Sequence, residues 1–392
     1  MEPDARRRDS TLIAAAAGLL LAAVLPQYLV ASVAVAMRAD FPFSNAELGV
    51  ALGVSFGLSA VLAPTAGRAI GRLGVRGAAA LSSGLVAGSS IAIATVADSA
   101  AAITVLMAIN GIGGGLGSPT FAAILAGNVA ARRQGLALGT LSSAPQFAAF
   151  CGGLALPLVV APFGWRASFL GSAAIGIACL AALLSRELWM PPRPVPEPGA
   201  PPRRRLRVIH VTAFSSALAS TAGMGMRAFL VLFAVSIGFS SSSAGLLLSL
   251  TGLLAIVSRL GFATLAGRRR RDPLLPVAAL MAAGAVGYAL MAVEASAAVV
   301  IGAMIAGGLG WGWQAPLNLA VLTSNPHTTG SAIGIQMAGF FAGALVGPPL
   351  VGLIVEHGSY RQAWLLCVVF ALVAAGVMLF ARSLTAREAR AG

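Results

Sequence analysis

Apolar residues run in long, nearly unbroken stretches along the chain, and short polar segments separate them. A helix needs about 20 mainly apolar residues to cross a bilayer, and each stretch reaches that length. The pattern therefore predicts an all-α membrane protein with twelve transmembrane helices. We expect these helices at residues 11–37, 45–66, 78–97, 101–124, 136–161, 165–185, 208–237, 243–266, 274–293, 297–322, 331–355 and 361–382.

The last six predicted helices repeat features of the first six. At an offset of 195 residues, matches occur between Gly135, Gly139, Gly152, Arg166 and Phe169 and, in the same order, Gly330, Gly334, Gly347, Arg361 and Trp364. At an offset of 197 residues, the glycine-rich run 111–115 aligns with the run 308–312. An ordered series of such matches indicates an internal duplication.

The duplication divides the chain into five parts. We expect a tail at 1–10, a six-helix bundle at 11–185, a linker at 186–207, a second six-helix bundle at 208–382 and a tail at 383–392. The linker is rich in proline and arginine, and proline-rich linkers are stiff and extended. Two six-helix pseudo-repeats are therefore the predicted architecture.

Composition agrees with a membrane protein and excludes several other classes. The 392 residues are 58% hydrophobic and 10% charged, and their mean hydropathy is +0.89. Soluble domains are about 45–50% apolar and about 25% charged. A soluble enzyme, a disordered chain and a nucleic-acid-binding domain are excluded on this ground, despite a net charge of +14.

The basic residues indicate the orientation in the membrane. All 26 are arginine, and 21 of them fall in the termini and in the loops that the helix count places on one side. Loops that carry an excess of positive charge remain in the cytoplasm. We therefore expect both termini in the cytoplasm and a multi-pass protein in the plasma (inner) membrane of a bacterium.

The segment between the second and third predicted helices reads GRAIGRLGVR over residues 67–76. Together with the twelve helices, the basic linker and the repeat, it resembles the major facilitator superfamily, whose members carry G-x-x-x-D-R-x-G-R-R at this place. The resemblance assigns a role in conformational change to Gly67, Arg68, Arg72, Gly74, Arg76 and, in the second half, Arg268. Gly71 replaces the aspartate of the family motif, so the charge-paired lock of the family lacks its carboxylate here.

Two further motifs of the superfamily are only partly kept. The fourth helix of many members reads R-x-x-Q-G, and here Met107 and Asn110 replace its arginine and glutamine. Of the antiporter motif in the fifth helix, only Gly152 and Gly153 remain. The resemblance covers residues 11–382 and implies a monomeric secondary transporter, which works by alternating access around a midplane site between the two bundles.

Arg227 and Arg259 are the two arginines that fall in the interior of predicted helices, whereas the other arginines lie in tails, in loops or at helix ends. An arginine at the bilayer centre costs roughly 2.5–3.5 kcal/mol on insertion scales, and Arg227 lies near the middle of its helix. We interpret Arg227 as a cavity residue that attracts an anionic group, with a structural arginine held by backbone carbonyls as the alternative. For Arg259, the resemblance to monocarboxylate and oxalate/formate porters implies a substrate role, and a structural role stays open.

Neutral polar residues near mid-depth are further candidates for substrate binding. The resemblance places helices 1, 4, 7 and 10 around the cavity. Trp311, Gln314 and Asn318 share one face of a regular helix. The complete set of candidates is Gln27, Tyr28, Asn110, Gln146, Arg227, Arg259, Trp311, Gln314 and Asn318. Hydrogen bonding between helices is the alternative role for each neutral residue.

The acidic residues fall at or near the ends of the predicted helices, not at mid-depth. Proton-coupled transporters usually place an ionisable residue inside the membrane, so coupling through a buried carboxylate is disfavoured and the coupling ion stays open. Ser44 and Glu47 have the spacing of a capping box for the second helix. We favour that structural role for Glu47 over a role as a proton relay.

These observations favour a secondary transporter of a small solute, with a preference for an organic or inorganic anion. The alternative is a proton antiporter that exports drugs or hydrophobic metabolites. The sequence holds no H-E-x-x-H motif and no phosphate-binding loop, and its three histidines and three cysteines are scattered. We therefore expect no enzymatic activity, no catalytic or metal site, no cofactor and no nucleic-acid partner; the lipid bilayer and the solute are the expected partners.

Overall fold

The structure is a computed structural model that describes residues 3–185, 203–268, 274–324 and 329–391. The chain folds into two compact units. Unit 1 comprises Met1–Phe43 and Val54–Pro196, and unit 2 comprises Ser44–Gly53 and Glu197–Gly392. Most of the predicted linker at 186–207 lies outside the described residues.

The all-α prediction is confirmed, because every regular element in the described ranges is helical. Eleven helices in this part of the chain are long and apolar enough to cross a membrane. One of them, Asn45–Val96, has 52 residues, which is more than twice the length of about 20 residues that one crossing needs. The helix count therefore agrees approximately with the twelve that the sequence predicts.

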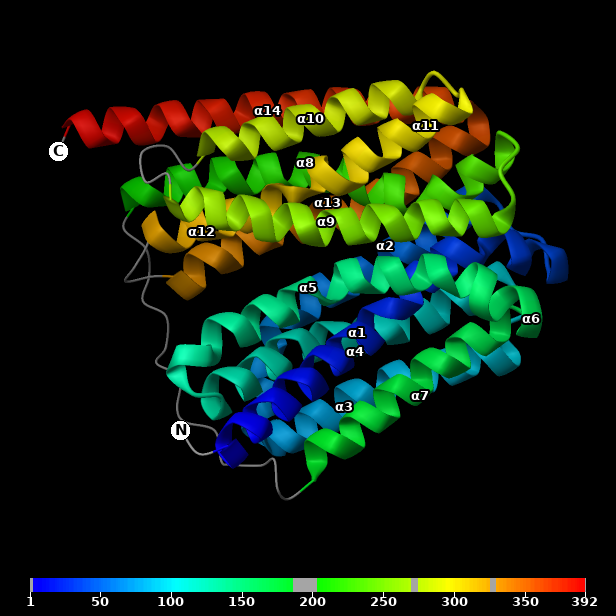
Figure 1. Ribbon diagram of the computed structural model, residues 1–392, viewed down its shortest axis with the longest axis horizontal. Helices are drawn as coiled ribbons and strands as arrows, with labels where there is room; N and C mark the ends of the chain where they lie inside the picture. The colour runs from blue at the N-terminus through cyan, green and yellow to red at the C-terminus, as the bar shows by residue number, and fades with distance from the viewer. Residues whose placement is uncertain (1–2, 186–202, 269–273, 325–328, 392) are drawn as a thin grey trace. The chain divides into compact units, whose positions relative to one another are not determined.

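Unit 1 is formed by the first half of the chain (Figure 1). Its elements are α1 (Pro3–Asp40), the later part of α2 (Asn45–Leu62), η1 (Ala63–Thr65), α3 (Ala66–Val96), α4 (Ala100–Asn128), α5 (Ala131–Ala155), η2 (Leu156–Val160), α6 (Ala161–Phe163) and α7 (Trp165–Leu184). α1 packs against α4, α5 and α7, and α3 packs against α4 and α7. Because α1 has neighbours on several sides, most of its apolar stretch is buried.

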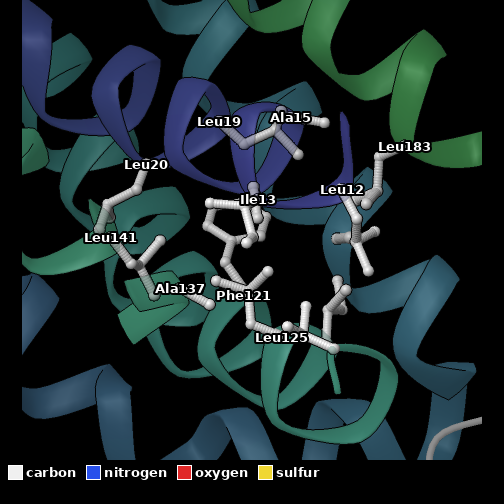
Figure 2. Close-up of a cluster of buried hydrophobic side chains, with 14 of the residues drawn as sticks. Leu12, Ile13, Ala15, Leu19, Leu20, Phe121, Leu125, Ala137, Leu141 and Leu183 are labelled. Carbon is white, nitrogen blue, oxygen red and sulfur yellow. The ribbon is translucent and has the colours of Figure 1, made fainter. Parts of the chain in front are cut away.

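Large apolar side chains fill the space between the helices of unit 1. Figure 2 shows one cluster, to which α1, α4, α5 and α7 all contribute. Its labelled members are Leu12, Ile13, Ala15, Leu19, Leu20, Phe121, Leu125, Ala137, Leu141 and Leu183. Packing of this kind, not hydrophobic expulsion from water, is what associates helices inside a lipid environment.

A polar cluster joins the ends of α1 and α7 in unit 1. Arg166 at the start of α7 forms an ion pair with Asp40 at the end of α1. The Trp165 indole Nε1 donates a hydrogen bond of 2.9 Å to the same carboxylate. Arg166 also donates to the carbonyl oxygen of Ala97 after α3, at 3.4 Å. The cluster therefore fastens three helix ends around Arg166, which the sequence repeat matches with Arg361.

Unit 2 is formed by the second half of the chain together with residues 44–53. Its elements are α8 (Arg203–Ser236), α9 (Ser241–Arg268), α10 (Leu274–Met291), α11 (Ser296–Ala303), η4 (Met304–Leu309), η5 (Gly310–Trp313), α12 (Gln314–Ser324), α13 (Thr329–His357) and α14 (Tyr360–Ala391). α8 packs against α13 and α14, and α10 packs against α14. α14 runs to Ala391, well beyond the predicted helix end at residue 382.

Glycines bring the backbones of α8 and α13 together. Gly339, Gly343 and Gly347 recur every fourth residue on α13, and a Cβ atom on any of them would lie closer than 3.0 Å to the backbone of α8. The backbone carbonyl oxygens that these glycines face also occur at every fourth residue of α8, at Ala213, Ala217 and Thr221. This glycine face therefore packs tightly against α8, as the small-residue rule for membrane helices describes.

The spanning helix predicted at 297–322 coincides with the apolar helix Ser296–Ser324, but its middle is not regular α-helix. α11 gives way to η4, in which hydrogen bonds span five residues, and then to η5, in which they span three, before α12 begins. Four glycines lie between residues 307 and 312, and Pro316 has no backbone N–H to donate to the residue four positions earlier. A prediction based on the periodicity of a regular α-helix therefore does not describe this segment. A similar five-residue pattern interrupts the predicted helix at 136–161, at η2.

The capping box predicted for the second helix is confirmed. The Ser44 backbone N–H donates to Glu47 Oε2 at 2.7 Å, and the Glu47 backbone N–H donates to Ser44 Oγ at 3.1 Å. A second carboxylate serves the same helix end, because Glu356 of α13 accepts from the Asn45 backbone N–H at 2.7 Å. Two of the unpaired N–H groups at the start of α2 are thereby satisfied by carboxylates, which the helix dipole also favours.

Candidate functional site

Arg227 lies inside unit 2 on α8, with only 2% of its surface exposed. Its Nη2 donates a hydrogen bond of 3.2 Å to the carbonyl oxygen of Gly307 in η4. Its guanidinium carbon lies 4.7 Å from the centre of the Trp311 ring, in a cation–π contact. The membrane-embedded cation therefore contacts a carbonyl dipole and one aromatic ring.

The Trp311 ring is held in place from several sides. Its centre lies 6.1 Å from that of Trp313 and 6.0 Å from that of Phe340 on α13. On α8, a Cβ atom at Gly223 would lie closer than 3.0 Å to the ring, so only glycine leaves room for it. Gly223 and Arg227 are one helical turn apart, and the indole lies across both. Among the described residues, none accepts a hydrogen bond from Trp311 Nε1.

Gln314 and Asn318 follow Trp311 on the next helix. Gln314 is buried and begins α12, whereas Asn318 is partly buried. Because Trp311 lies in η5, where residues three apart eclipse one another, Trp311 and Gln314 still fall on one side despite the loss of regular helix. Asn318 Oδ1 receives no hydrogen bond from the described residues.

In unit 1, the structure joins Gln27 and Asn110 through a residue that sequence reasoning missed. Gln27 Nε2 donates to Ser55 Oγ at 2.9 Å, and Ser55 Oγ donates to Asn110 Oδ1 at 3.4 Å. Asn110 Nδ2 in turn donates to the carbonyl oxygen of Ala23 at 3.3 Å. The polar chain, defined as Gln27, Ser55, Asn110 and the Ala23 carbonyl, connects α1, α2 and α4. It supports the inter-helix role for Asn110.

The remaining candidates lie in different surroundings. Tyr28 is buried on α1. A Cβ atom added to Gly152 of α5 would lie 3.1 Å from the Cβ atom of Tyr28. Gly152, one of the two glycines kept from the antiporter motif, therefore packs against Tyr28. Gln146 is buried on α5. Arg259 is partly buried and ends the stretch Ser241–Arg259 of α9 that is apolar enough to cross a membrane. Each of these residues is placed by a spanning helix.

The loop motif of residues 67–76 is helical. It forms the first part of α3, in which Arg68 and Arg72 are exposed and Arg76 is partly buried. Gly74 interrupts the helix with φ +68° and ψ 166°, a conformation that is open essentially to glycine alone. In the second half, Arg268 is the last residue of α9. The motif therefore marks a kink between two helical segments, not an irregular loop.

Replacing Gly74 by alanine is expected to lower the stability of the protein by about 1–3 kcal/mol, because a side chain makes this backbone conformation strained. The melting temperature of the purified protein in detergent measures the effect. Gly71→Ala is the matched control, since neither glycine has a neighbouring atom within 4 Å of an added Cβ and only Gly74 has a positive φ. Equal melting temperatures for the two variants would contradict the kink.

A metal centre finds no support in the described part of the chain, where no three histidine, cysteine, aspartate or glutamate side chains gather. Sequence reasoning missed three of the groups that contact the candidate residues, namely Ser55, Gly223 and the carbonyl of Gly307. Ser55 and Gly223 are small, and a backbone carbonyl leaves no mark in a residue pattern.

Comparison with known proteins agrees with this architecture. The family model described as Major Facilitator Superfamily matches residues 11–336. Two curated relatives from Mycobacterium tuberculosis are both described as uncharacterized MFS-type transporters. One, from strain CDC 1551, is 28% identical over 326 residues, which is 79% of this chain and 71% of the relative. The other, from strain H37Rv, is 27% identical over 324 residues, with the same coverage.

Solved structures of transporters share the fold at low sequence identity. The nucleoside transporter NupG has a TM-score of 0.73 and 14% identity, covering 94% of this chain and 99% of its own. A D-xylose-proton symporter has a TM-score of 0.72 and 16% identity, covering 94% and 96%. A bacterial homolog to the human lysosomal transporter Spinster has a TM-score of 0.75 and 16% identity, covering 98% of each chain.

Proposed function

Because the chain belongs to the Major Facilitator Superfamily, we propose that it carries a small anion across the membrane by alternating access. The observation that carries the anion preference is Arg227, a cation that is almost fully buried within a membrane-spanning helix. Charge at such depth is costly and marks substrate or ion pathways. An anionic solute gains most from it, because attraction between opposite charges is strong where water is excluded.

The surroundings of Arg227 favour a compact organic anion. A guanidinium offers five N–H donors in a planar fork that matches a carboxylate. One of its nitrogens donates to the Gly307 carbonyl, and its central carbon lies over the Trp311 ring. We propose Arg227 and Trp311 as the principal substrate residues in unit 2, with Gln314 and Asn318 beside them. Gln27, Tyr28, Asn110 and Gln146 are the candidates in unit 1, and Arg259 is a second candidate for the anion.

One observation favours the alternative, a proton antiporter that exports hydrophobic drugs or metabolites. Trp311, Trp313, Phe340 and Phe341 form a continuous aromatic cluster in unit 2. Aromatic faces bind lipophilic solutes as well as cations. We rank this function second, since a buried arginine disfavours the lipophilic cations that such exporters carry.

We also propose the arrangement in the cell. The protein is a monomer in the plasma (inner) membrane of a bacterium, it has bundles at 11–185 and 208–382, and both termini and the linker at 186–207 are cytoplasmic. The bias of arginine towards one set of loops supports this orientation. We assign it transport and no enzymatic activity, and we propose that residues 67–76 and Arg268 act in the conformational change.

Uptake into proteoliposomes tests the proposed function. The wild-type protein is expected to take up radiolabelled lactate, propionate, benzoate or 4-hydroxybenzoate faster than protein-free liposomes, with and without an imposed proton gradient that reports coupling. Uridine and xylose are the neutral controls. Uptake of a neutral solute alone would refute the anion preference, and proton-driven efflux of ethidium without anion uptake would establish the exporter.

A further inference from the structure

The direction of every hydrogen bond in the polar chain of unit 1 follows from one fixed acceptor. The Ala23 carbonyl can only accept, so the Asn110 group that faces it is the amide nitrogen, at 3.3 Å. Asn110 Oδ1 is then the acceptor that faces Ser55, and the Ser55 hydroxyl gives its single proton to it. Ser55 Oγ is left as an acceptor for Gln27, which must present Nε2. The orientation of the Gln27 amide is therefore determined.

Glycines hold Ser55 in the position that this chain requires. A Cβ atom at Gly111 of α4 would lie closer than 3.0 Å to the Ser55 backbone, and one at Gly115 would do the same at Ser59. α2 thus contacts α4 through Ser55 and Ser59, and α4 contacts α2 through Gly111 and Gly115. The two residues of each pair lie about one helical turn apart. Ser59 Oγ adds a hydrogen bond of 2.9 Å to the Gly111 carbonyl. Ser55 is fully buried and has little freedom to move away from Asn110.

The hydrogen bonds of the polar chain do not account for one acceptor, the side-chain oxygen Oε1 of Gln27. Gln27 is 4% exposed, and none of the described residues donates a hydrogen bond to its Oε1. A buried acceptor without a donor is costly, so the group favours any donor that reaches it. Asn110 differs, because both ends of its amide already take part in the chain.

We infer that Ser55 is a positioning residue, which orients Gln27 so that Oε1 accepts a hydrogen bond from an O–H or N–H group of the transported solute. The inference rests on the proposed function and narrows its substrate class to anions that carry a hydroxyl or amino group. Gln27 is the specificity-determining residue, and Ser55 acts through it. A solute that lacks the donor leaves Oε1 unpaired and binds more weakly.

Two pairs of radiolabelled anions, which differ only in a hydroxyl group, test the inference in proteoliposomes. Lactate is compared with propionate, and 4-hydroxybenzoate with benzoate. The wild-type protein is expected to show a KM about threefold to tenfold lower for the hydroxylated member of a transported pair, as one neutral hydrogen bond predicts. Ser55→Ala is expected to bring the two KM values together by raising that of the hydroxylated member, with little change in Vmax.

A double-mutant cycle separates positioning from mere structure. Gln27→Met keeps the length of the side chain and removes the amide, so it is expected to abolish the same preference. If Ser55 acts through Gln27, then Ser55→Ala changes the KM ratio no further in the Gln27→Met protein. Ser59→Ala is the matched control, because its hydroxyl lies on the same helix contact outside the polar chain. It is expected to keep the wild-type ratio.

The outcomes distinguish the inference from the function on which it rests. Wild-type uptake of both members of a pair with equal KM values overturns the donor preference and leaves anion transport standing. A preference that survives in a folded Gln27→Met protein overturns the role of Gln27, even if Ser55→Ala fails to fold. Absence of protein-dependent uptake for all four anions overturns the proposed function and the inference with it.

Discussion

An Arg227→Gln protein is expected to take up anions roughly 10- to 100-fold less efficiently, measured as Vmax/KM. Charge-assisted hydrogen bonds are worth about 1.5–3 kcal/mol, and each 1.4 kcal/mol corresponds to a factor of ten. Glutamine keeps a hydrogen-bond donor for the Gly307 carbonyl but removes the charge and the cation–π contact with Trp311. Initial rates of anion uptake into proteoliposomes, over a range of concentrations, measure the loss.

Two further variants control for the charge and for the fold. Arg227→Lys keeps the charge without the planar fork of donors, so it is expected to recover only part of the activity. Arg361→Gln removes an exposed arginine at the start of α14, and we expect uptake close to that of the wild type. A folded Arg227→Gln protein with unchanged anion KM and Vmax would show that Arg227 only fastens α8 to η4.

Replacing Gly343 by alanine is expected to destabilise the protein by about 1–2 kcal/mol. An added Cβ would lie closer than 3.0 Å to the Ala217 carbonyl oxygen, the Ser220 hydroxyl and the Thr221 backbone nitrogen. Two of these neighbours are backbone atoms of α8, which cannot turn aside, so the two helices must separate. Overpacking of this kind costs about 1–3 kcal/mol, and the better helix propensity of alanine returns at most about 1 kcal/mol.

The melting temperature in detergent, followed by tryptophan fluorescence, measures this loss. Gly334→Ala is the matched control on the same helix, because no atom lies within 4 Å of a Cβ at that position. It is expected to leave the melting temperature unchanged or slightly higher. Equal melting temperatures for Gly343→Ala and Gly334→Ala would mean that α8 and α13 do not touch as described.

The sequence predicted the features of this protein that depend on side-chain polarity. Long apolar stretches predicted the spanning helices, and the packing face of Gly339, Gly343 and Gly347 has the every-fourth-residue spacing of one side of a helix. The spacing of Ser44 and Glu47 predicted a helix cap that is also confirmed. Each of these features depends on residues at spacings that the geometry of a regular helix determines, so the sequence alone reveals it.

Features that depend on the backbone escaped prediction. The change of helix type from η4 to η5 follows from glycine content and Pro316, and hydropathy does not register it. The partner of Arg227 is a carbonyl oxygen that any residue at position 307 would supply. Ser55 could not be distinguished in the sequence because serines are ordinary in an apolar helix, and only the neighbouring helices give its hydroxyl two partners.

The hydrogen bonds of Asn110 and Arg227 connect corresponding helices of the two halves. The offset of 197 residues that aligns the glycine-rich runs also aligns Asn110 with Gly307. In the first half, a side chain of the fourth helix donates to a carbonyl of the first. In the second half, a side chain of the first helix donates to a carbonyl of the fourth. Donor and acceptor have changed places, so the same pair of helices is tied together from opposite sides, by a neutral amide in one half and by a charged guanidinium in the other.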